Sequence, residues 1–184
     1  MNVYDFDNTI LKGDSSARFF VYCLFHTPRM WLDIPAQIGN GALFLLKIRK
    51  KKAFKQRMFR YLQWLPNTDR MISDFWDVNQ KRVKMWYRKN HRADDVVISA
   101  SPEFLIAPIC ERLGIQRVIA SPIDKRTGEY HGENCHGEEK VRAFRARFGS
   151  VQPENFYSDS YSDSPMAKIS RNAYLVKGEK LKPW

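Results

Sequence analysis

From residue 96 to the end of the chain, short apolar runs alternate with helix-like segments, and this alternation constrains the fold more than any other feature. The apolar runs lie at 96–98, 117–121, 156–158 and 174–176. Between them, one predicted helix has Ser101 as its cap and Pro102 at its first position, and ends at Gly114; others cover 138–148 and 164–171. Residues 122–136 predict a hairpin around Thr127 and Gly128. Strands and helices that alternate through short connections predict a parallel α/β sheet.

The N-terminal half of the chain follows a different pattern. Residues 2–6 predict a short strand, whereas residues 15–26, 51–65 and 69–90 predict helices, with no strand-like alternation among them. A length of 184 residues suits one domain, or one core domain that carries an insertion. We therefore expect an α/β fold: a Rossmann-like parallel sheet flanked by helices, formed by residues 1–13 and 91–184, with a helical cap of residues 14–90 inserted after the first strand.

Two carboxylates stand where the first predicted strand ends, in the sequence DFDNT. Alternate side chains of an extended chain point the same way, so Asp5 and Asp7 are expected to face one crevice while Phe6 faces the core. In open α/β sheets, ligands bind beyond the carboxyl ends of the strands. Like charges so close together need a cation or a proton between them. Taken alone, the segment is equally compatible with a turn in which the aspartates cap the backbone.

Other polar side chains also follow predicted strands or begin predicted helices: Ser99, Lys140, Asp159 and Asp163. Lys140 lies in the first turn of a predicted helix, where a cation opposes the helix dipole and a bound phosphate would be favourable. With Asp5 and Asp7, the two later aspartates would place four carboxylates on one rim. Oxygen ligands of this kind, next to a phosphate, favour Mg²⁺.

The segments DFDNT, SAS, GEEK and SDSYSDSPM, in this order and spacing, resemble the four signatures of the haloacid dehalogenase-like (HAD) phosphatase superfamily. The helical insertion after the first signature is similar to that of its phosphoserine phosphatase-like branch. This resemblance covers essentially the whole chain. It implies that Asp5 is the nucleophile that forms an aspartyl-phosphate, and that Asp7 protonates the leaving oxygen and then activates water.

The resemblance also implies binding roles. The residues implied to bind the phosphorylated substrate are Asn8, Thr9, Ser99, Ala100 and Lys140. The residues implied to bind Mg²⁺ are Asp5, Asp7 through its carbonyl, Asp159 and Asp163.

Four positions depart from the family pattern. Asn8 replaces the commoner glycine, which is tolerable because asparagine visits left-handed backbone conformations. Ser158, Ser160 and Ser162 stand where phosphoserine phosphatases usually have glycine or asparagine. These serines weaken the case for phosphoserine as the substrate and leave the metal chemistry unchanged.

The chain has a formal net charge of +11, and its basic excess lies mostly before residue 93. A basic run from Lys47 to Arg57 follows the apolar segment Ile34 to Leu46, which is too short for a membrane span of about 20 residues. An apolar segment followed by a basic cluster is typical of a helix at a membrane surface, and resembles the cap of bacterial phosphatidylglycerophosphate phosphatases. The alternative is a helical bundle that buries the apolar side chains and leaves the basic ones in solvent.

Three functions are therefore compared. We favour a Mg²⁺-dependent phosphatase that acts on a small soluble metabolite. The alternative is the same chemistry on a phospholipid head group at the surface of an anionic membrane. The third, a non-catalytic anion-binding module, is disfavoured by the complete set of aspartates, serine and lysine, and no nucleic-acid-binding signature occurs. The oligomeric state is left open.

The cysteines number three and stand far apart, which fits a reducing cytoplasm better than a disulfide framework or a zinc site. Cys135 and His136 are adjacent and could form a metal or thiol pair. We interpret them instead as the end of the hairpin, near the active site.

Overall fold

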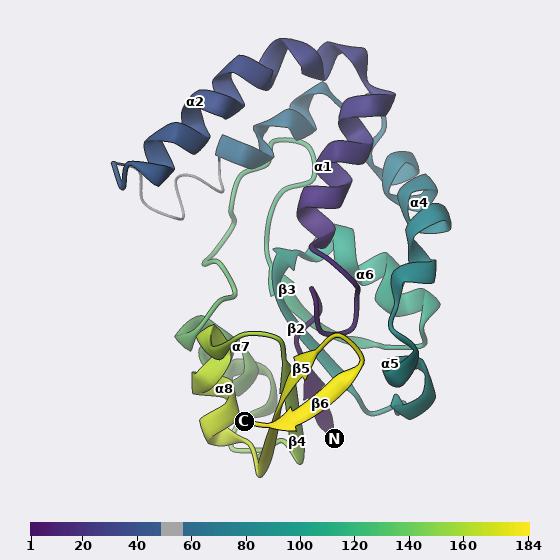
Figure 1. Ribbon diagram of the computed structural model, residues 1–184, viewed down its shortest axis with the longest axis vertical. Helices are drawn as coiled ribbons and strands as arrows, with labels where there is room; N and C mark the ends of the chain where they lie inside the picture. Colours follow the sequence, from purple (N-terminus) through teal and green to yellow (C-terminus); the bar gives the residue numbers. More distant parts are fainter. Residues whose placement is uncertain (49–56) are drawn as a thin grey trace.

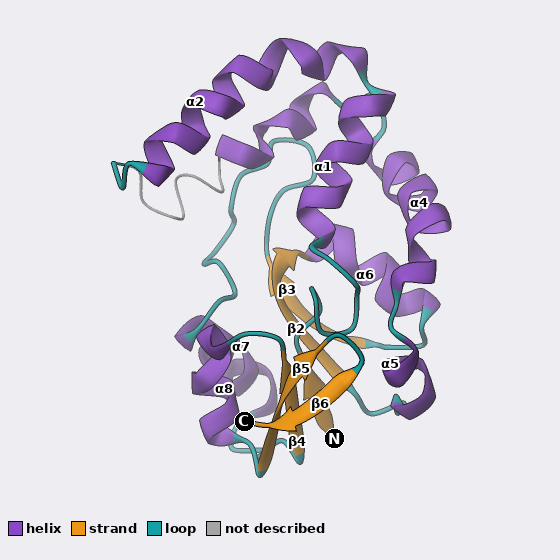
Figure 2. Cartoon of the chain, viewed as in Figure 1, coloured by secondary structure: helices purple, strands orange, loops and turns teal. Residues whose placement is uncertain are grey.

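The computed structural model describes residues 1–48 and 57–184 as a six-stranded sheet with helices on both faces (Figures 1 and 2). The strand order is β3-β2-β1-β4-β5-β6; the first five strands are parallel and β6 is antiparallel to β5. The strands are β1 (Asn2–Tyr4), β2 (Val96–Pro102), β3 (Arg117–Ser121), β4 (Asn155–Ser158), β5 (Asn172–Lys177) and β6 (Lys180–Pro183). The predicted fold class is confirmed, although β6 was not predicted.

The central strand β1 is short and buried along its whole length. Val3 pairs with Val96 of β2 on one side and with Phe156 of β4 on the other, and all three side chains are fully buried. A strand covered on both faces is a continuous apolar run. Because β1 pairs with β2 on one side and with β4 on the other, it ends in the middle of the sheet. The residues after β1 therefore lie between the ends of these two strands.

Helices α7 (Glu138–Phe148) and α8 (Ser164–Ile169) cover one face of the sheet, at the lower left of Figure 1. Phe144 and Met166 from these helices are fully buried in one cluster with Val3 and Phe156. Helix α6 (Glu103–Arg112) lies on the other face, where Leu105 and other side chains join a second cluster that includes Tyr4 and Phe6.

The segment between β1 and β2 is helical, as expected. Its elements are α1 (Ser15–His26), η1 (Pro28–Asp33), α2 (Ile34–Leu45), η2 (Phe59–Trp64), α4 (Thr68–Asn79), η3 (Gln80–Arg82) and α5 (Met85–Asn90). Part of this segment shares the core of the sheet, because Phe19 and Phe75 are in the same cluster as Phe6 and the Trp76 indole nitrogen donates a hydrogen bond to the Leu105 carbonyl at 2.7 Å. Helix α2 instead forms the upper edge of the molecule (Figure 2).

The prediction of one helix over 69–90 is wrong. Helix α4 ends at Asn79, and Val83 pairs as an isolated antiparallel bridge with Leu11. The Lys84 amide donates a hydrogen bond to the Ile10 carbonyl at 2.8 Å, and the Lys12 amide donates one to the Arg82 carbonyl at 2.9 Å. The break occurs because this extended segment satisfies the backbone of the loop that follows β1.

The predicted helix over 51–65 is only partly tested, because residues 51–56 lie outside the described residues. Its described end forms a 3₁₀ turn, η2, and not the expected α-helix. The hairpin prediction is confirmed: Ile123 pairs with Tyr130, and Gly128 takes the left-handed conformation at φ 76°.

The predicted start of the helix after Ser101 is wrong by one residue. Strand β2 continues to Pro102, with a shift in its pairing register to β3 between Ile98 and Pro102, and α6 begins at Glu103. Ser101 does not cap the helix because its hydroxyl binds Asp7. The irregular end of β2 thus turns a serine toward the residues that follow β1.

Candidate active site

All of the predicted site residues except Thr9 line one cavity of about 390 Å³ at the carboxyl ends of the parallel strands. The loop after β1 contributes Asp5, Asp7 and Asn8, the end of β2 contributes Ser99 and Ala100, and α7 contributes Lys140. The loop after β4 contributes Asp159 and Asp163. The sheet topology therefore brings the four sequence segments to one place.

Lys140 is the buried centre of this site. Its ammonium donates hydrogen bonds to Asp5 Oδ1 and to Asp163 Oδ2, each at 2.7 Å, and the side chain is 2% exposed. Burial raises the pKa of Asp5 to about 7, although the ammonium opposes this rise. Burial alone lowers the pKa of Lys140, but the two carboxylates outweigh that effect and raise it above its ordinary value. Lys140 remains charged and holds both carboxylates in fixed positions.

Asp7 faces the same cavity from a separate hydrogen-bonding environment. The Ser15 amide donates to Asp7 Oδ1 at 2.6 Å, and the Ser101 hydroxyl donates to Asp7 Oδ2 at 2.5 Å. Burial raises the pKa of Asp7 to about 6, a rise that these hydrogen bonds partly offset. A carboxyl group whose pKa lies this close to neutral pH is suited to general acid–base chemistry.

Phe6, which stands between Asp5 and Asp7 in the sequence, is fully buried, as expected from the alternation of side chains. Its ring packs edge-on against Trp76. Asn8 takes the left-handed conformation at φ 57° that its identity allowed. Its carbonyl accepts a hydrogen bond from the buried Lys84 ammonium, which fixes the turn.

Thr9 is the exception among the predicted site residues. It is fully buried and is not part of the cavity lining. Its hydroxyl donates a hydrogen bond to Asp5 Oδ2 at 3.3 Å. Thr9 therefore orients the Asp5 carboxylate, and its predicted contact with the phosphate stays a prediction.

The remaining polar groups are also fixed by neighbours. The Ser99 hydroxyl accepts a hydrogen bond from the Ser101 amide at 3.1 Å. The Ser158 hydroxyl donates to Asp163 Oδ2 at 2.8 Å, so this departure from the family pattern supports a predicted metal ligand. The Asp159 carbonyl accepts a hydrogen bond from the Lys177 ammonium at 3.0 Å, and burial raises the pKa of the Asp159 carboxyl.

The charges that line the cavity fit a divalent cation. Asp14 adds a fifth carboxylate to the four predicted ones, whereas the described lining contains a single lysine and no arginine. This excess of negative charge would repel a phosphate unless a cation were also bound. Hard oxygen donors of this kind suit Mg²⁺. Within residues 1–48 and 57–184, however, no group of three or more aspartate, glutamate, histidine or cysteine side chains is arranged to hold a metal ion. In this cavity the Lys140 ammonium instead forms a hydrogen bond with one oxygen of Asp5 and one oxygen of Asp163.

Several lining residues were not predicted. Ser101 and Ser16 come from the end of β2 and the start of α1, and Met58 and Phe59 come from the inserted segment. His136, in contrast, was interpreted from the sequence as part of a hairpin end near the active site, and it lines the cavity as well. Spacing in the sequence gives no signal for these residues, since their places depend on how the inserted helices fold back over the sheet.

Cys135 and His136 do not form a joint site. Cys135 is buried in the core beside α7, and burial raises the pKa of its thiol. Its backbone amide donates a hydrogen bond to the Ser121 hydroxyl at 3.0 Å. The two neighbours face different surroundings, in agreement with the structural interpretation of Cys135.

The chain is similar to known phosphatases over part of its length. It is 34% identical over 94 residues to a probable phosphatase of Mycobacterium tuberculosis, a match that covers 47% of this chain and 33% of the relative. It is 30% identical over 122 residues to a histidinol-phosphatase of Neisseria meningitidis serogroup C, which covers 55% of each chain. The matches thus span about a third and about half of the length of these relatives.

Solved structures with little sequence identity share the fold. A protein of unknown function from Bordetella pertussis Tohama I matches with a TM-score of 0.75 at 19% identity, over 94% of this chain and 87% of that one. A phosphoserine phosphohydrolase-like protein from Francisella tularensis matches with a TM-score of 0.56 at 15% identity, over 94% and 86%. The family model of the haloacid dehalogenase-like hydrolases matches residues 3–168. The chain therefore belongs to the haloacid dehalogenase-like hydrolase family.

Proposed function

We propose that this protein is a Mg²⁺-dependent phosphatase that hydrolyses a phosphomonoester through a phosphoryl group transferred to Asp5. The observation that carries the proposal is the buried arrangement in which Lys140 bridges Asp5 and Asp163, in the cavity that Asp7 also lines. Two relatives that match part of this chain are named as phosphatases, and these names support the same reaction class.

In the first step, an oxygen of Asp5 attacks the phosphorus atom and the bond to the leaving oxygen breaks. Asp7, whose pKa burial raises to about 6, donates its proton to that leaving oxygen. The hydrogen bonds from Ser15 and Ser101 fix the Asp7 carboxyl for this transfer. Lys140 and Ser99 lie where they can stabilise the charge on the transferred phosphoryl oxygens.

In the second step, Asp7 takes a proton from a water molecule, which attacks the phosphorus of phosphoryl-Asp5. The bond between Asp5 and phosphorus breaks, inorganic phosphate leaves, and the Asp5 carboxylate is restored. One carboxyl group thus serves as acid and then as base, which requires a pKa not far from the working pH.

The aspartate oxygens of the cavity supply the ligand chemistry for Mg²⁺, with Asp5, the Asp7 carbonyl, Asp159 and Asp163 as the proposed ligand set. A bound Mg²⁺ would neutralise charge on the phosphate and favour the ionised form of Asp5. Ser158 and Thr9 would keep Asp163 and Asp5 oriented toward it through the hydrogen bonds described above.

The sequence favoured a small soluble substrate, and the carboxylate, hydroxyl and ammonium groups that line the cavity support this choice. A second candidate substrate is a phosphate on a phospholipid head group. The observation that favours it is the exposed apolar surface of α2 in the inserted segment, where Ile38 and Leu45 are 68% and 81% exposed.

A generic aryl phosphate tests the proposal without knowledge of the natural substrate. Asp5→Asn should lower the hydrolysis rate at least about a hundredfold, because a carboxamide cannot accept the phosphoryl group. Asp74→Asn, at an exposed position of α4, is the matched control and should keep the parent rate. Excess chelator should abolish activity and Mg²⁺ should restore it. Substantial turnover by Asp5→Asn, or full activity in chelator, would refute the corresponding part of the proposal.

A further inference from the structure

Helix α2 exposes apolar side chains and buries polar ones, which is the reverse of an ordinary surface helix. Its exposed residues recur at the spacing of one helical face. This outer face consists of Pro35, Ile38, Gly39, Ala42 and Leu45 and continues at Leu46, directly after the helix. None of these side chains is polar. The polar residues of the helix point inward: Asn40 is 2% exposed, and the Gln37 amide donates hydrogen bonds to Asp33 Oδ2 at 2.6 Å and to the Arg57 carbonyl at 3.3 Å.

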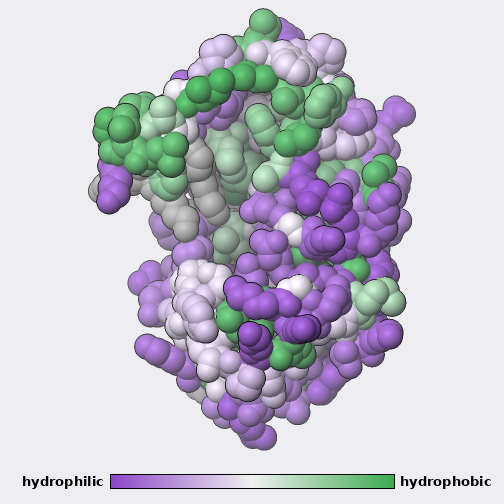
Figure 3. All heavy atoms as spheres, in the orientation of Figure 1, coloured by the Kyte–Doolittle hydropathy of each residue, from purple (hydrophilic) through white to green (hydrophobic). Residues whose placement is uncertain are grey.

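The outer face is not the edge of a buried core. Ile38, Leu45 and Leu46 are 68%, 81% and 68% exposed, and no α2 side chain belongs to either of the two core clusters of the described residues. Exposed apolar side chains continue beyond both ends of the helix, at Leu32 and Ile48. Figure 3 shows this hydrophobic surface along the top and upper left of the molecule. Contiguous exposed apolar surface marks a site of interaction.

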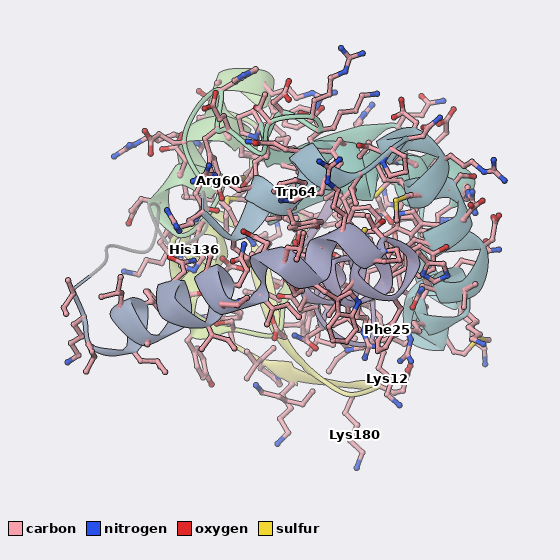
Figure 4. All side chains as sticks on the ribbon, turned by 90° about the horizontal axis from the view of Figure 1, so that it is seen from above. Lys12, Phe25, Arg60, Trp64, His136 and Lys180 are labelled. Carbon is pink, nitrogen blue, oxygen red and sulfur yellow. The ribbon has the colours of Figure 1, made fainter. Side chains whose placement is uncertain are left out.

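In Figure 4, which looks down onto this region, α2 lies across the molecule with Trp64 on one side of it and Phe25 on the other. Both of these aromatic side chains are themselves exposed, Trp64 at 36% and Phe25 at 71%. Arg29 is exposed as well and its guanidinium lies over the Trp64 ring, 5.1 Å from the ring centre. Apolar, aromatic and basic side chains are thus combined on this side of the protein.

The charge of the segment restricts what can cover this surface. Between Ile34 and Thr68 the sequence contains no acidic residue. The basic residues in this range are Lys47, Arg49, Lys50, Lys51, Lys52, Lys55, Arg57 and Arg60. Lys47, two residues after the end of α2, is exposed. A partner of this region must therefore present an apolar layer next to a dense negative charge.

We propose that the outer face of α2 docks onto an anionic lipid bilayer, with its apolar side chains at the boundary between head groups and acyl chains. Interfacial helices bind in this way, through buried apolar area together with attraction of basic residues to acidic lipids. Among the described residues, none of the helices has the length and apolar character that a membrane span requires. The proposal goes beyond the phosphatase activity and does not depend on it.

A second copy of the chain fits the same surface less well. A symmetric contact through α2 would bring two acid-free basic segments together, and like charges repel. An anionic bilayer offers the apolar layer and the opposite charge at once. The test therefore includes the self-association of the protein as an outcome.

The test is co-sedimentation of the purified full chain with vesicles of phosphatidylcholine, with and without phosphatidylglycerol, in chelator so that no turnover occurs. The protein should bind the vesicles that contain phosphatidylglycerol, and should be released when NaCl is raised from about 0.05 M to about 0.5 M. Ile38→Gln combined with Leu45→Gln should weaken binding at least about tenfold, because it removes apolar area from the interface.

The matched control replaces two exposed apolar residues of the core domain, Val151→Gln with Leu181→Gln, and should bind as the parent does. Circular dichroism and the rate on an aryl phosphate check that the variants fold. Binding that is absent in the parent, or equal in the two double variants, would overturn the proposal. A concentration-dependent dimer that the Ile38 and Leu45 replacements abolish, without vesicle binding, would assign the surface to a second copy instead. Loss of activity in Asp5→Asn tests the phosphatase proposal separately, since that variant should still bind vesicles.

Discussion

The Lys140 ammonium lies 2.7 Å from Asp5 Oδ1, although the two residues are 135 positions apart in the sequence. The contact is buried, and the same ammonium also binds Asp163. A single cation from the first turn of α7 therefore fixes one carboxylate from the loop after β1 and another from the loop after β4. The arrangement makes Lys140 important for both the stability and the chemistry of the site.

Lys140→Met should lower the unfolding free energy at pH 8 by about 3–5 kcal/mol, because it leaves two buried carboxylates without their cation. At pH 5 the loss should be smaller, since Asp5, whose pKa burial raises to about 7, can then take up a proton in the folded state. Denaturant unfolding in chelator at the two pH values measures this difference. Equal losses at both pH values would show that packing, and not charge pairing, is the role of Lys140.

Asp7→Asn should stabilise the protein at pH 8 in chelator. Burial raises the pKa of Asp7 from 3.8 to about 6, so the folded state holds its proton more tightly than the unfolded state does. The contribution of Asp7 to the free energy of unfolding is fully present below pH 4 and is lost as the pH rises through 6. The shift corresponds to about 3 kcal/mol above pH 6. Thermal unfolding should therefore show a gain for the variant at pH 8 and none below pH 4, and a gain that does not depend on pH would contradict the assignment.

Ser101→Ala should slow aryl phosphate hydrolysis about tenfold, because the Asp7 carboxyl loses one of the two hydrogen bonds that hold it. The hydrogen bond lowers the pKa of Asp7, so its removal should also move the pH profile of the reaction upward. Ser150→Ala, at an exposed position after α7, is the control and should change neither quantity. A slower reaction with an unchanged pH profile would mean that Ser101 acts through the shape of the cavity alone.

Trp76→Phe should destabilise the fold by about 1–3 kcal/mol while leaving the aryl phosphate reaction intact. The indole donates a buried hydrogen bond to the Leu105 carbonyl that phenylalanine cannot make, and the smaller ring leaves a cavity in the core. The contact joins α4 of the inserted segment to α6. Denaturant unfolding gives the free energy, and a variant as stable as the parent would contradict the view that this segment and the sheet share one core.

The order of the elements and most of the site could be predicted because both depend on local features of the sequence. Strand ends and turn residues locate Asp5, Asp7, Lys140 and Asp163 along the chain, and a parallel sheet then brings them to one edge. The left-handed conformation of Asn8 followed from its side chain and its place in the loop.

Features that depend on tertiary contacts could not be predicted. The helix expected over 69–90 is interrupted because Val83 pairs with Leu11, a contact that no local pattern encodes. Thr9 binds Asp5 and Ser101 binds Asp7 because of side-chain directions that the fold sets. The reversed polarity of α2 was visible only once the exposure of each face was known, since its composition suits a buried helix equally well.

The central claim is that Asp5 carries the phosphoryl group, and the most direct measurement is mass spectrometry of the protein quenched in acid during turnover of an aryl phosphate with Mg²⁺. The account predicts a phosphoryl adduct on the peptide that contains Asp5. The adduct should accumulate in Asp7→Asn, which cannot activate water for the second step, and should be absent in Asp5→Asn. A phosphoryl group on a different residue, or steady turnover with no adduct in either the parent or Asp7→Asn, would contradict the account.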